Sequence, residues 1–466
     1  MRGGTRAPPP GVAHFFGGGR GLFTASPFRE ALRERFVNQD ADPYVYEHFR
    51  RLGTARFTRR AYLVNPTGGV EGGLRPFVPP RYERVHVPWK ALLPPFTPER
   101  VWTADVCVPM HRVSAPFVER LLALPVPPRS DVRFCVCLDA PPSDAARRAM
   151  LALEARDGRL RVRQNAANVG ASATRNRLLD ECHSDYAIFL DDDVVPDERL
   201  LLEYCRAARR EPARRGFVGL SAMPHDGRLW TDAIHVSTLY FWYVARHARG
   251  EPVAWGVTAN LMVKWDPSTR FDPRFPKTGG GEDIDLCLQL GGTLAPVPDA
   301  KIVHPWRDGP LRMFRRLFEW AIGDGMLIPK HRALAYRAPP NAVELLLACL
   351  CARPAAAWIV PVAEALAHLF AELVLHPRLN GAHSHELLAE APWPRRVALL
   401  LVGAAARATS DAGRLWGQLR RGELAHIGER FDWYAGRNPA ARHFECLRAG
   451  ALCAFALALT LASYCK

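Results

Sequence analysis

The residues best suited to chemistry begin with three consecutive carboxylates, Asp191, Asp192 and Asp193, which end an apolar run that starts at Tyr186. Adjacent carboxylates repel one another unless a cation lies between them, and oxygen ligands suit Mg²⁺ or Mn²⁺. On an extended backbone Asp191 and Asp193 point to one side and Asp192 to the other. The pattern predicts a divalent cation site; the alternative is a solvated strand end that caps the next helix.

A second acidic segment follows three glycines and contains Glu282, Asp283 and Asp285. Glycines allow the backbone to turn tightly and to close near a ligand. Acidic residues are also common in the first turn of a helix, where the macrodipole stabilises them. The segment is a weak indication of a functional site by itself. Its occurrence together with the aspartate triplet makes a functional site the favoured interpretation.

Two further segments supply candidates of other types. His304 ends a short β-like run, and it either completes a carboxylate-bound Mn²⁺ site or is a structural histidine. The text from Asn168 to Arg177 is rich in small residues and precedes a helical pattern. A helix N-terminus of this kind can approach an anion. Arg175 in this segment either contacts such an anion or braces the sheet.

The chemistry-bearing residues lie within a region where short β-rich runs alternate with helical patterns. This alternation predicts an α/β fold with a mostly parallel sheet and helices on both faces, whose ligand crevice lies at the carboxyl ends of the strands. The expected strands are Ala104–Pro109, Val132–Asp139, Leu160–Gln164, Tyr186–Asp191, Phe217–Ala222 and Gly256–Lys264. The expected helices are Ala115–Leu124, Ser143–Ala155, Ala171–Cys182 and Glu198–Arg209.

Amino-acid composition and the pattern of expected helices and strands divide the 466 residues into three regions. We expect a Pro/Gly-rich extension over 1–102, an α/β catalytic domain over 103–310, and a helical region over 311–466. The net charge of +15 comes from scattered arginines rather than a basic tract, which argues against a nucleic-acid partner. No apolar segment of signal-peptide length follows the N-terminus, and we expect a cytoplasmic protein.

The uncharged run Ala449–Cys465 raises the question of a membrane. Its 17 residues lie at the lower limit for a bilayer-spanning helix, so a packed or membrane-surface helix is an equal alternative. A basic cluster at Arg312, Arg315 and Arg316 faces anionic lipid, a diphosphate or solvent. The sequence therefore leaves open whether the C-terminal region spans, lies on or avoids a membrane.

Five segments, in order and spacing, resemble the family 2-like inverting glycosyltransferases of the GT-A fold. The matching text is CVPMHR at 107–112, FCVCLDAPP at 134–142, NVGASATRN at 168–176, FLDDDV at 189–194 and GGGEDIDL at 279–286, followed by HPW at 304–306. The resemblance covers residues 103 to 310. It implies a nucleoside-diphosphate sugar as donor, with a uridine diphosphate sugar favoured, and a divalent cation, Mn²⁺ or Mg²⁺, as cofactor.

The resemblance also implies roles for individual residues. Asp283 looks like the catalytic base, with Glu282 as its neighbour and substitute. The metal ligands implied are Asp193, Asp191 and His304. The nucleotide-sugar contacts implied are Pro109, Asp139, Asn168, Arg175, Asp191 and Asp192, with Asp139 similar to the residue that reads the base.

The expected reaction is metal-dependent, inverting transfer of a single sugar to a hydroxyl of a glycan, lipid or protein. Processive members carry a (Q/R)xxRW motif, which the text near Arg312 does not match, so single transfer is favoured over polymerisation. Aromatic residues from Trp230 to Trp255 form either an acceptor cradle or core, and Asn260 is a candidate contact. Two alternatives remain: a sugar-nucleotide nucleotidyltransferase, and a catalytically inactive GT-A binding protein.

Overall fold

The computed structural model describes residues 101–464 apart from 224–226, 238–239, 249, 306–309 and 377–385, together with the short paired strands β1 (Phe15–Phe16) and β2 (Arg20–Gly21). The chain divides into two compact units, 1–100 and 101–466. Nearly all of the predicted N-terminal extension lies outside the described residues. The account below concerns the second unit.

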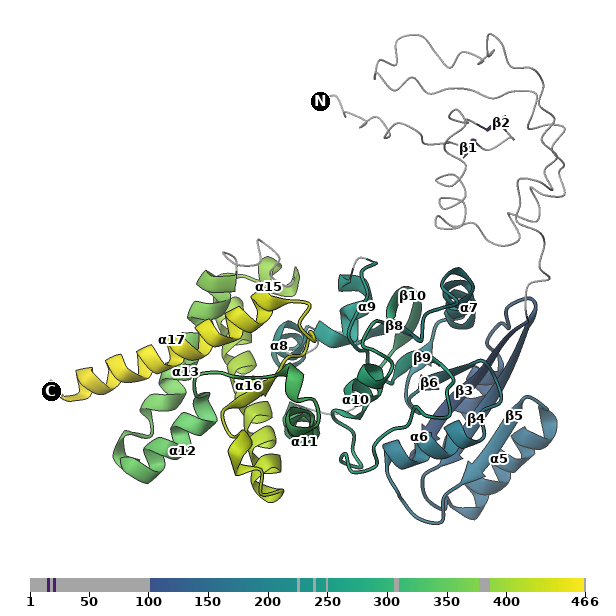
Figure 1. Cartoon of the computed structure of the whole chain (residues 1–466), viewed down its shortest axis with the longest axis horizontal. Coiled ribbons are helices and arrows are strands. Elements are labelled where there is room, and N and C mark those ends of the chain that lie inside the picture. The colour runs from purple at the N-terminus through teal and green to yellow at the C-terminus, as the bar shows by residue number, and fades with distance from the viewer. Residues whose placement is uncertain are drawn as a thin grey trace, which may run out of the picture. The chain divides into compact units, whose positions relative to one another are not determined.

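An eight-stranded mixed sheet forms the centre of this unit, in the order β5-β4-β3-β6-β9-β8-β10-β7 (Figure 1). Strands β5, β4, β3 and β6 run parallel to one another, as do β8 and β10, while β9 and β7 run antiparallel to their neighbours. The strands are β3 (Trp102–Met110), β4 (Ser130–Leu138), β5 (Leu160–Gln164), β6 (Tyr186–Leu190), β7 (Val195–Pro196), β8 (Gly216–Ala222), β9 (Asn260–Lys264) and β10 (Ala295–Val303).

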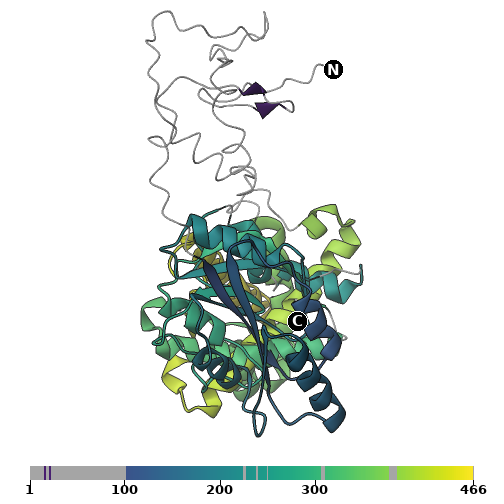
Figure 2. The ribbon, with the colours of Figure 1, turned by 90° about the vertical axis from the view of Figure 1, so that its right-hand side faces the viewer.

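Each central strand buries both faces, because its side chains alternate between two hydrophobic clusters. In β3, Val106 and Val108 belong to one cluster and Cys107 to the other. Helices α4 (Ala115–Leu122), α5 (Asp144–Arg156) and α7 (Leu200–Arg210) cover the first face. Helices α6 (Ala171–Asp180), α9 (Val244–His247) and α10 (Glu282–Gln289) cover the second. Figure 2 shows helices on both sides of the sheet. The predicted α/β class, with a mostly parallel sheet and helices on both faces, is confirmed.

A helical region follows the sheet, as the sequence predicted. Its elements are α11 (Pro310–Lys330), η4 (Arg332–Leu334), α12 (Ala342–Ala352), η5 (Pro354–Ala356), α13 (Ile359–Phe370), η6 (Ala371–Leu375), α15 (Glu386–Glu390), α16 (Trp393–Arg420), η7 (Leu424–His426) and α17 (Pro439–Tyr464), with a small sheet of β11 (Ala335–Arg337) and β12 (Glu429–Phe431). Helix α8 (Leu229–Ser237) and η3 (Tyr240–Tyr243) precede β9 in the chain.

Helix α11 lies directly against the glycine loop that precedes α10. A methyl group added to Gly323 would lie 1.8 Å from the backbone oxygen of Gly280. The two backbones therefore touch where both residues lack a side chain. This contact brings the helical region to the edge of the sheet where the acidic segments lie.

Candidate active site

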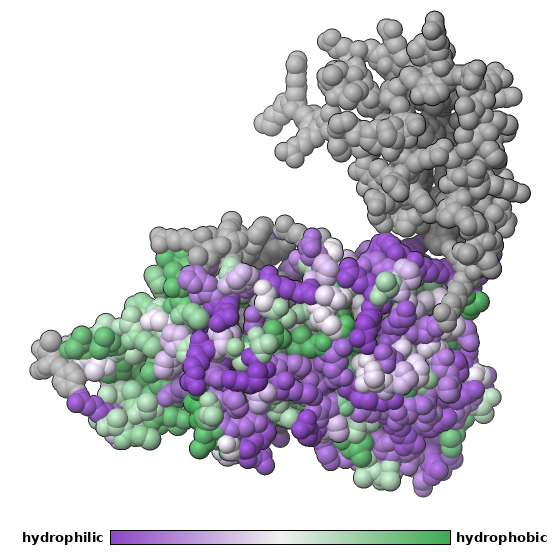
Figure 3. Space-filling model, viewed as in Figure 1, coloured by the Kyte–Doolittle hydropathy of each residue, from purple (hydrophilic) through white to green (hydrophobic). Residues whose placement is uncertain are grey.

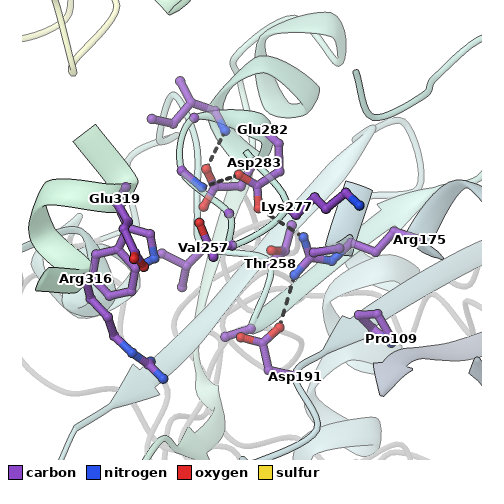
Figure 4. Close-up of a pocket in the computed structure, with 18 of the residues that line it drawn as sticks. Pro109, Arg175, Asp191, Val257, Thr258, Lys277, Glu282, Asp283, Arg316 and Glu319 are labelled. Carbon is purple, nitrogen blue, oxygen red and sulfur yellow. Dashed lines mark hydrogen bonds and ion pairs between the residues drawn. The ribbon is translucent and has the colours of Figure 1, made fainter. Parts of the chain in front are cut away.

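The predicted site residues line one cavity of about 620 Å³ at the carboxyl ends of β3, β4 and β6 (Figure 4). The sequence placed the aspartate triplet and the glycine-flanked acids in a common site, and they do lie in this cavity. The predicted residues that line it are Pro109, Asp139, Asn168, Arg175, Asp191, Asp192, Asp193, Glu282, Asp283 and His304.

Three predicted metal ligands form a compact group. Ligand atoms of Asp191, Asp193 and His304 all lie within 4.8 Å of one another. His304 Nε2 lies 3.3 Å from Asp193 Oδ1, and His304 Nδ1 lies 3.3 Å from the carbonyl oxygen of Pro305. In the tautomer with the proton on Nδ1, the Nδ1–H donates a hydrogen bond to the Pro305 carbonyl, and the Nε2 lone pair faces the two carboxylates. Two carboxylates and one imidazole are a donor set that fits Mn²⁺ or Mg²⁺.

Burial of these carboxylates in their ionised form is energetically unfavourable unless a positive charge lies beside them. Asp193 is 4% exposed, and its burial raises the pKa of the carboxyl group, an effect that His304 and Arg112 oppose. The turn after β6, rather than an extended strand, separates the three aspartates. Even so, Asp191 and Asp193 meet at one point and Asp192 faces elsewhere, which is the division predicted from the sequence.

Asp192 holds the loop that follows β3. Its Oδ2 accepts hydrogen bonds from the backbone N–H groups of His111 and Arg112, at 2.8 and 2.6 Å. The Arg112 guanidinium lies 2.5 Å from Asp192 Oδ1 and 2.6 Å from Asp193 Oδ2. Asp192 therefore shapes the wall of the cavity, and Arg112, to which the sequence gave no role, joins the site.

Asp139 fixes the segment that leads into α6. It follows β4 and is 6% exposed. Its carboxylate accepts hydrogen bonds from the backbone N–H groups of Val169 and Gly170, both at 3.1 Å, and from the Thr174 hydroxyl at 2.6 Å. Asn165 also donates to it at 3.1 Å. These contacts hold Asn168 and the start of α6 beside the cavity.

Arg175 connects the two acidic segments. It is 4% exposed, and its two terminal nitrogens lie 3.1 Å from Asp191 and 3.1 Å from Glu282 (Figure 4). Its guanidinium carbon also lies 5.4 Å from the centre of the Phe271 ring. In this structure Arg175 joins the two acidic segments, whereas the alternatives predicted for it were contact with an anion and bracing of the sheet.

The two acids at the start of α10 have different surroundings. Glu282 is 4% exposed and accepts hydrogen bonds from the Gly280 N–H at 2.6 Å and from Arg175. Asp283 is half-buried, and its Oδ1 accepts the Ile284 N–H at 2.9 Å. Burial and the neighbouring Glu282 raise the pKa of Asp283 to about 8. A carboxyl group in this pKa range is suited to accepting a proton near neutral pH.

Asp285 belongs to the framework of the fold. It is fully buried, with Lys330 Nζ at 2.9 Å and His331 Nε2 at 2.9 Å from its carboxylate. These contacts tie α10 to the end of α11. Asp285 does not line the cavity.

The helical region supplies further cavity residues, of which the sequence had singled out only Arg316, with a diphosphate as one of its alternative partners. Helix α11 contributes Arg316, Glu319, Trp320 and Asp324, and Trp433 comes from the segment after β12. Burial, together with Asp283 and Glu282, raises the pKa of Asp324 well above its ordinary range. The spacing of Arg316, Trp320 and Asp324, each four positions apart on one helical face, is the signal that could have identified them.

The aromatic and amide candidates divide between the cavity and the core. Trp242 and Trp255 line the cavity, whereas Trp230 does not. Asn260 is fully buried, donates to the carbonyl groups of Leu220 and Ala300, and accepts from the Tyr204 hydroxyl. Its predicted contact with substrate is therefore wrong, since these bonds join β8, β9 and β10 inside the sheet.

Comparison with protein families gives a match over the part of the chain that carries the triplet. Residues 105–239 match the family model described as Glycosyl transferase family 2. The match spans 105–239, and these residues include the aspartate triplet and the segment from Asn168 to Arg177. This match agrees with the resemblance read from the motifs, and it supports the predicted class of enzyme, a glycosyltransferase.

A curated relative and several solved structures are also similar. The succinoglycan biosynthesis protein ExoM of Rhizobium meliloti (strain 1021) is 31% identical over 209 residues, 43% of this chain, and the chain covers 65% of that protein's length. The mannosyltransferase PcManGT from Pyrobaculum calidifontis, in complex with GDP-Man and Mn²⁺, is 15% identical over 76% of this chain and 86% of its own, with a TM-score of 0.37. GalNAc-T7 with UDP, GalNAc and Mn²⁺ is 12% identical over 50% of this chain and 51% of its own, with a TM-score of 0.37. Scores this low support no inference about donor or metal.

Proposed function

We propose that this chain transfers a single sugar from a nucleoside-diphosphate sugar to an acceptor hydroxyl, with inversion at the anomeric carbon and with a divalent cation. The observation that carries the proposal is one cavity holding both a metal-capable group and a carboxyl group of raised pKa. The match of residues 105–239 to the family 2 model supports the reaction class.

The metal would be held by Asp191, Asp193 and His304. When bound there, a divalent cation supplies a Lewis acid that stabilises the charge of a departing diphosphate. The donor set fits either Mn²⁺ or Mg²⁺ and leaves the choice between them open. Asp192 and Arg175 hold this group in shape through their contacts with the β3 loop and with Glu282.

Asp283 would act as the base. In the transfer step the acceptor oxygen bonds to the anomeric carbon, the bond from that carbon to the diphosphate oxygen breaks, and the hydroxyl proton passes to Asp283. A positioned carboxylate contributes about 10²–10⁴ in rate. A single in-line displacement of this kind inverts the anomeric centre. Glu282, which is occupied by Arg175 and by the Gly280 N–H, would orient the loop rather than take the proton.

The nucleotide would lie along the ends of β3, β4 and β6. Pro109, Asp139, Asn168, Arg175, Asp191 and Asp192 line this side of the cavity. We assign to Asp139 the contact with the base and to Asp191 the contact with the ribose, as the family resemblance implies. The donor favoured by that resemblance is a uridine diphosphate sugar, and the acceptor is a hydroxyl of a glycan, lipid or protein.

The catalytic domain would comprise residues 103–310 and the helical region 311–466. Helix α11 contributes to the cavity from beyond the first of these boundaries. The helical region would therefore complete the site on the side away from the nucleotide, where the acceptor has to enter. Trp320 and Trp433 offer flat apolar faces there, of the kind that pack against sugar rings.

We also propose that the helical region contacts the cytoplasmic face of a membrane. The residues 354–375 and 439–463 are long and apolar enough to cross a bilayer, with 39% and 17% of their apolar windows buried. Exposed apolar side chains gather on α12, α13 and α17, which form the apolar end of the unit in Figure 3. This apolar sector consists of Leu347, Leu350, Trp358, Val362, Leu366, Phe370, Leu447, Leu457 and Leu461.

Six of the nine sector residues lie in stretches of sequence without charge. The stretches 345–352, 354–363 and 449–464 contain no charged residue. Farther along α13 and α17, Arg448 pairs with Glu364 at 2.9 Å inside the bundle. An apolar surface of this extent, bounded by charges, is typical of an interaction with a membrane or another protein. We favour a lipid membrane over a protein partner because the apolar sector extends over three helices.

The experiment that tests the proposal measures nucleotide release from a set of UDP- and GDP-sugars with Mn²⁺, Mg²⁺ or EDTA. We expect metal-dependent release from one donor, loss of that activity in Asp193→Ala, and retained donor binding without turnover in Asp283→Asn. The control is Asp299→Asn, because that residue is on the surface of β10, with a side chain 62% exposed. Binding of nucleotide without turnover by any donor would favour an inactive binding protein. A parallel assay with a nucleoside triphosphate and a sugar 1-phosphate tests the other alternative, because release of pyrophosphate from that pair would favour a nucleotidyltransferase.

A further inference from the structure

Arg112 bridges two of the three clustered aspartates from the loop that follows β3, the strand next to β6. Its guanidinium lies 2.5 Å from Asp192 and 2.6 Å from Asp193, whose side chains are 5% and 2% exposed. It comes from the loop after β3, at the edge where the diphosphate of a donor would lie. It is therefore a positive charge in direct contact with a predicted metal ligand.

The side chain of Arg112 can move without its backbone. Asp192 holds the loop through the N–H groups of His111 and Arg112 themselves, at 2.8 and 2.6 Å. These bonds remain if the guanidinium leaves. The Arg112 side chain is 42% exposed and borders the cavity, so open space lies next to it. The Arg112 side chain can therefore move between the aspartates and an anion in the cavity while its backbone stays in place.

A divalent cation and the Arg112 guanidinium would compete for the charge of Asp193, since Arg112 pairs with Oδ2 and the oxygen that faces His304 is Oδ1. Asp193 belongs to the group of ligand atoms within 4.8 Å of one another, and the same carboxylate pairs with Arg112. Two positive centres on one buried carboxylate repel each other, and low local polarity strengthens that repulsion. Diphosphate oxygens would relieve it, because guanidinium binds phosphate through two parallel hydrogen bonds.

We infer that Arg112 is a diphosphate-binding residue that couples binding of the cation to binding of the nucleotide. Without nucleotide it neutralises Asp192 and Asp193 and weakens cation binding; with nucleotide it turns to the diphosphate and releases Asp193 to the cation. The inference rests on the proposed metal site. It requires that cation and nucleotide strengthen each other's binding by the same factor.

Two measurements on Arg112→Gln and Arg112→Lys test this. Electron paramagnetic resonance of free Mn²⁺ gives the Mn²⁺ affinity without nucleotide. Calorimetry of UDP and of GDP, with and without saturating Mn²⁺, gives the coupling factor for whichever nucleotide binds. The control is Arg163→Gln, because Arg163 is a comparably exposed arginine, at 37%, that pairs with Glu154 and Glu181 away from the cavity.

We expect Arg112→Gln to bind Mn²⁺ alone several-fold more tightly than the unaltered protein, and to lose most of a coupling of about tenfold or more. Arg112→Lys should keep the weak binding of Mn²⁺ alone but show reduced coupling, since an ammonium group cannot bind phosphate in the same two-bonded way. Arg163→Gln should match the unaltered protein in both measurements.

Unchanged Mn²⁺ affinity in Arg112→Gln would overturn the inference, and so would a coupling factor equal to that of the unaltered protein. If neither nucleotide strengthens Mn²⁺ binding in the unaltered protein, the coupling itself is wrong. A protein that binds no Mn²⁺ at all would instead overturn the metal site and with it the proposed function. The two failures are therefore distinguishable.

Discussion

Arg175 and Glu282 lie 107 positions apart in the chain and form a buried ion pair at 3.1 Å, with both side chains 5% exposed. The other terminal nitrogen of Arg175 reaches Asp191. One residue of α6 thus joins the aspartate triplet after β6 to the glycine loop before α10. This link holds the two acidic segments beside each other in the cavity.

Replacement of Arg175 should therefore destabilise the protein strongly. Removal of one partner leaves a buried charge without compensation, which costs about 3–5 kcal/mol. We expect Arg175→Met to lower the free energy of unfolding by this amount in urea titrations. The control is Arg163→Gln, whose ion pairs are more exposed and should cost about 0–1 kcal/mol. Equal losses in the two variants would contradict the role given to the Arg175 bridge.

Asp283→Asn should remove turnover while it increases stability. The raised pKa of Asp283, about 8 against an ordinary 3.8, means that the folded protein keeps this group protonated where the unfolded chain ionises it. Stability is therefore lost as pH rises from about 4 to about 8, because the unfolded state releases a proton that the folded state retains. Asparagine removes this cost, and we expect a gain of about 1–2 kcal/mol at pH 8.

The measurement is thermal unfolding of both proteins between pH 4 and pH 9. The stability difference between Asp283→Asn and the unaltered protein should grow through that range and level off above pH 8. A difference that stays constant with pH would show that Asp283 ionises normally in the folded state. Asp299→Asn serves as the control, since its carboxyl group is 62% exposed.

Turnover should follow the opposite pH dependence. A base has to be ionised to accept a proton, so the rate at low acceptor concentration should rise with pH until the pKa of Asp283 is passed. We expect an acid limb with a midpoint near pH 8 in the free enzyme, measured by nucleotide release with the donor that the screen identifies. A rate that is flat from pH 6 to pH 9 would exclude Asp283 as the base.

The sequence predicted the fold and the site unequally well, for physical reasons. The strands that carry Asp139 and Asp191 were predicted within a few residues, because buried parallel strands are nearly continuous apolar runs that end abruptly in polar residues. That end is also the ligand-binding edge, which placed the aspartate triplet correctly. The glycine-flanked acids precede α10 and end no strand, and the family resemblance placed them in the same site. At Asp139 and Asp191 the sequence pattern that marks the end of a strand also marks the position of the site.

The remaining residues depend on contacts that no local pattern encodes. Asn260 looks like a polar candidate in an apolar run, yet its amide bonds join strands in the core. Arg112 was read as part of a motif but its contact with Asp193 arises only when β3 and β6 pair. Trp320 and Asp324 reach the cavity because α11 returns to the sheet, a packing fixed by Gly280 and Gly323.

That glycine contact gives another prediction. Gly280 has φ +114°, and a methyl group there would lie 2.3 Å from the backbone oxygen of Trp320. Gly280→Ala should therefore push α11 away from the loop, lower stability by about 2 kcal/mol or more, and reduce turnover beyond its effect on donor binding. Gly158→Ala is the matched control, with no atom within 4 Å of the added methyl and a negative φ. If Gly280→Ala unfolds like Gly158→Ala, the close approach of α11 is not required.

The apolar sector should bind lipid through its outermost leucines. Leu457 and Leu461 are 61% and 57% exposed on α17. We expect the full chain to co-sediment with vesicles of phosphatidylcholine containing about one quarter phosphatidylglycerol, because exposed apolar area and the net charge of +15 both favour an anionic membrane. Leu457→Glu combined with Leu461→Glu should lower the bound fraction about tenfold, since carboxylates do not enter the acyl region. Leu424→Glu is the control, because Leu424 is 63% exposed but lies outside the three helices.

Two outcomes would contradict contact between the apolar sector and lipid. In one, the double variant and the Leu424→Glu control bind vesicles equally; in the other, the unaltered chain stays in solution. A protein partner would then be the better explanation of the exposed leucines of the sector.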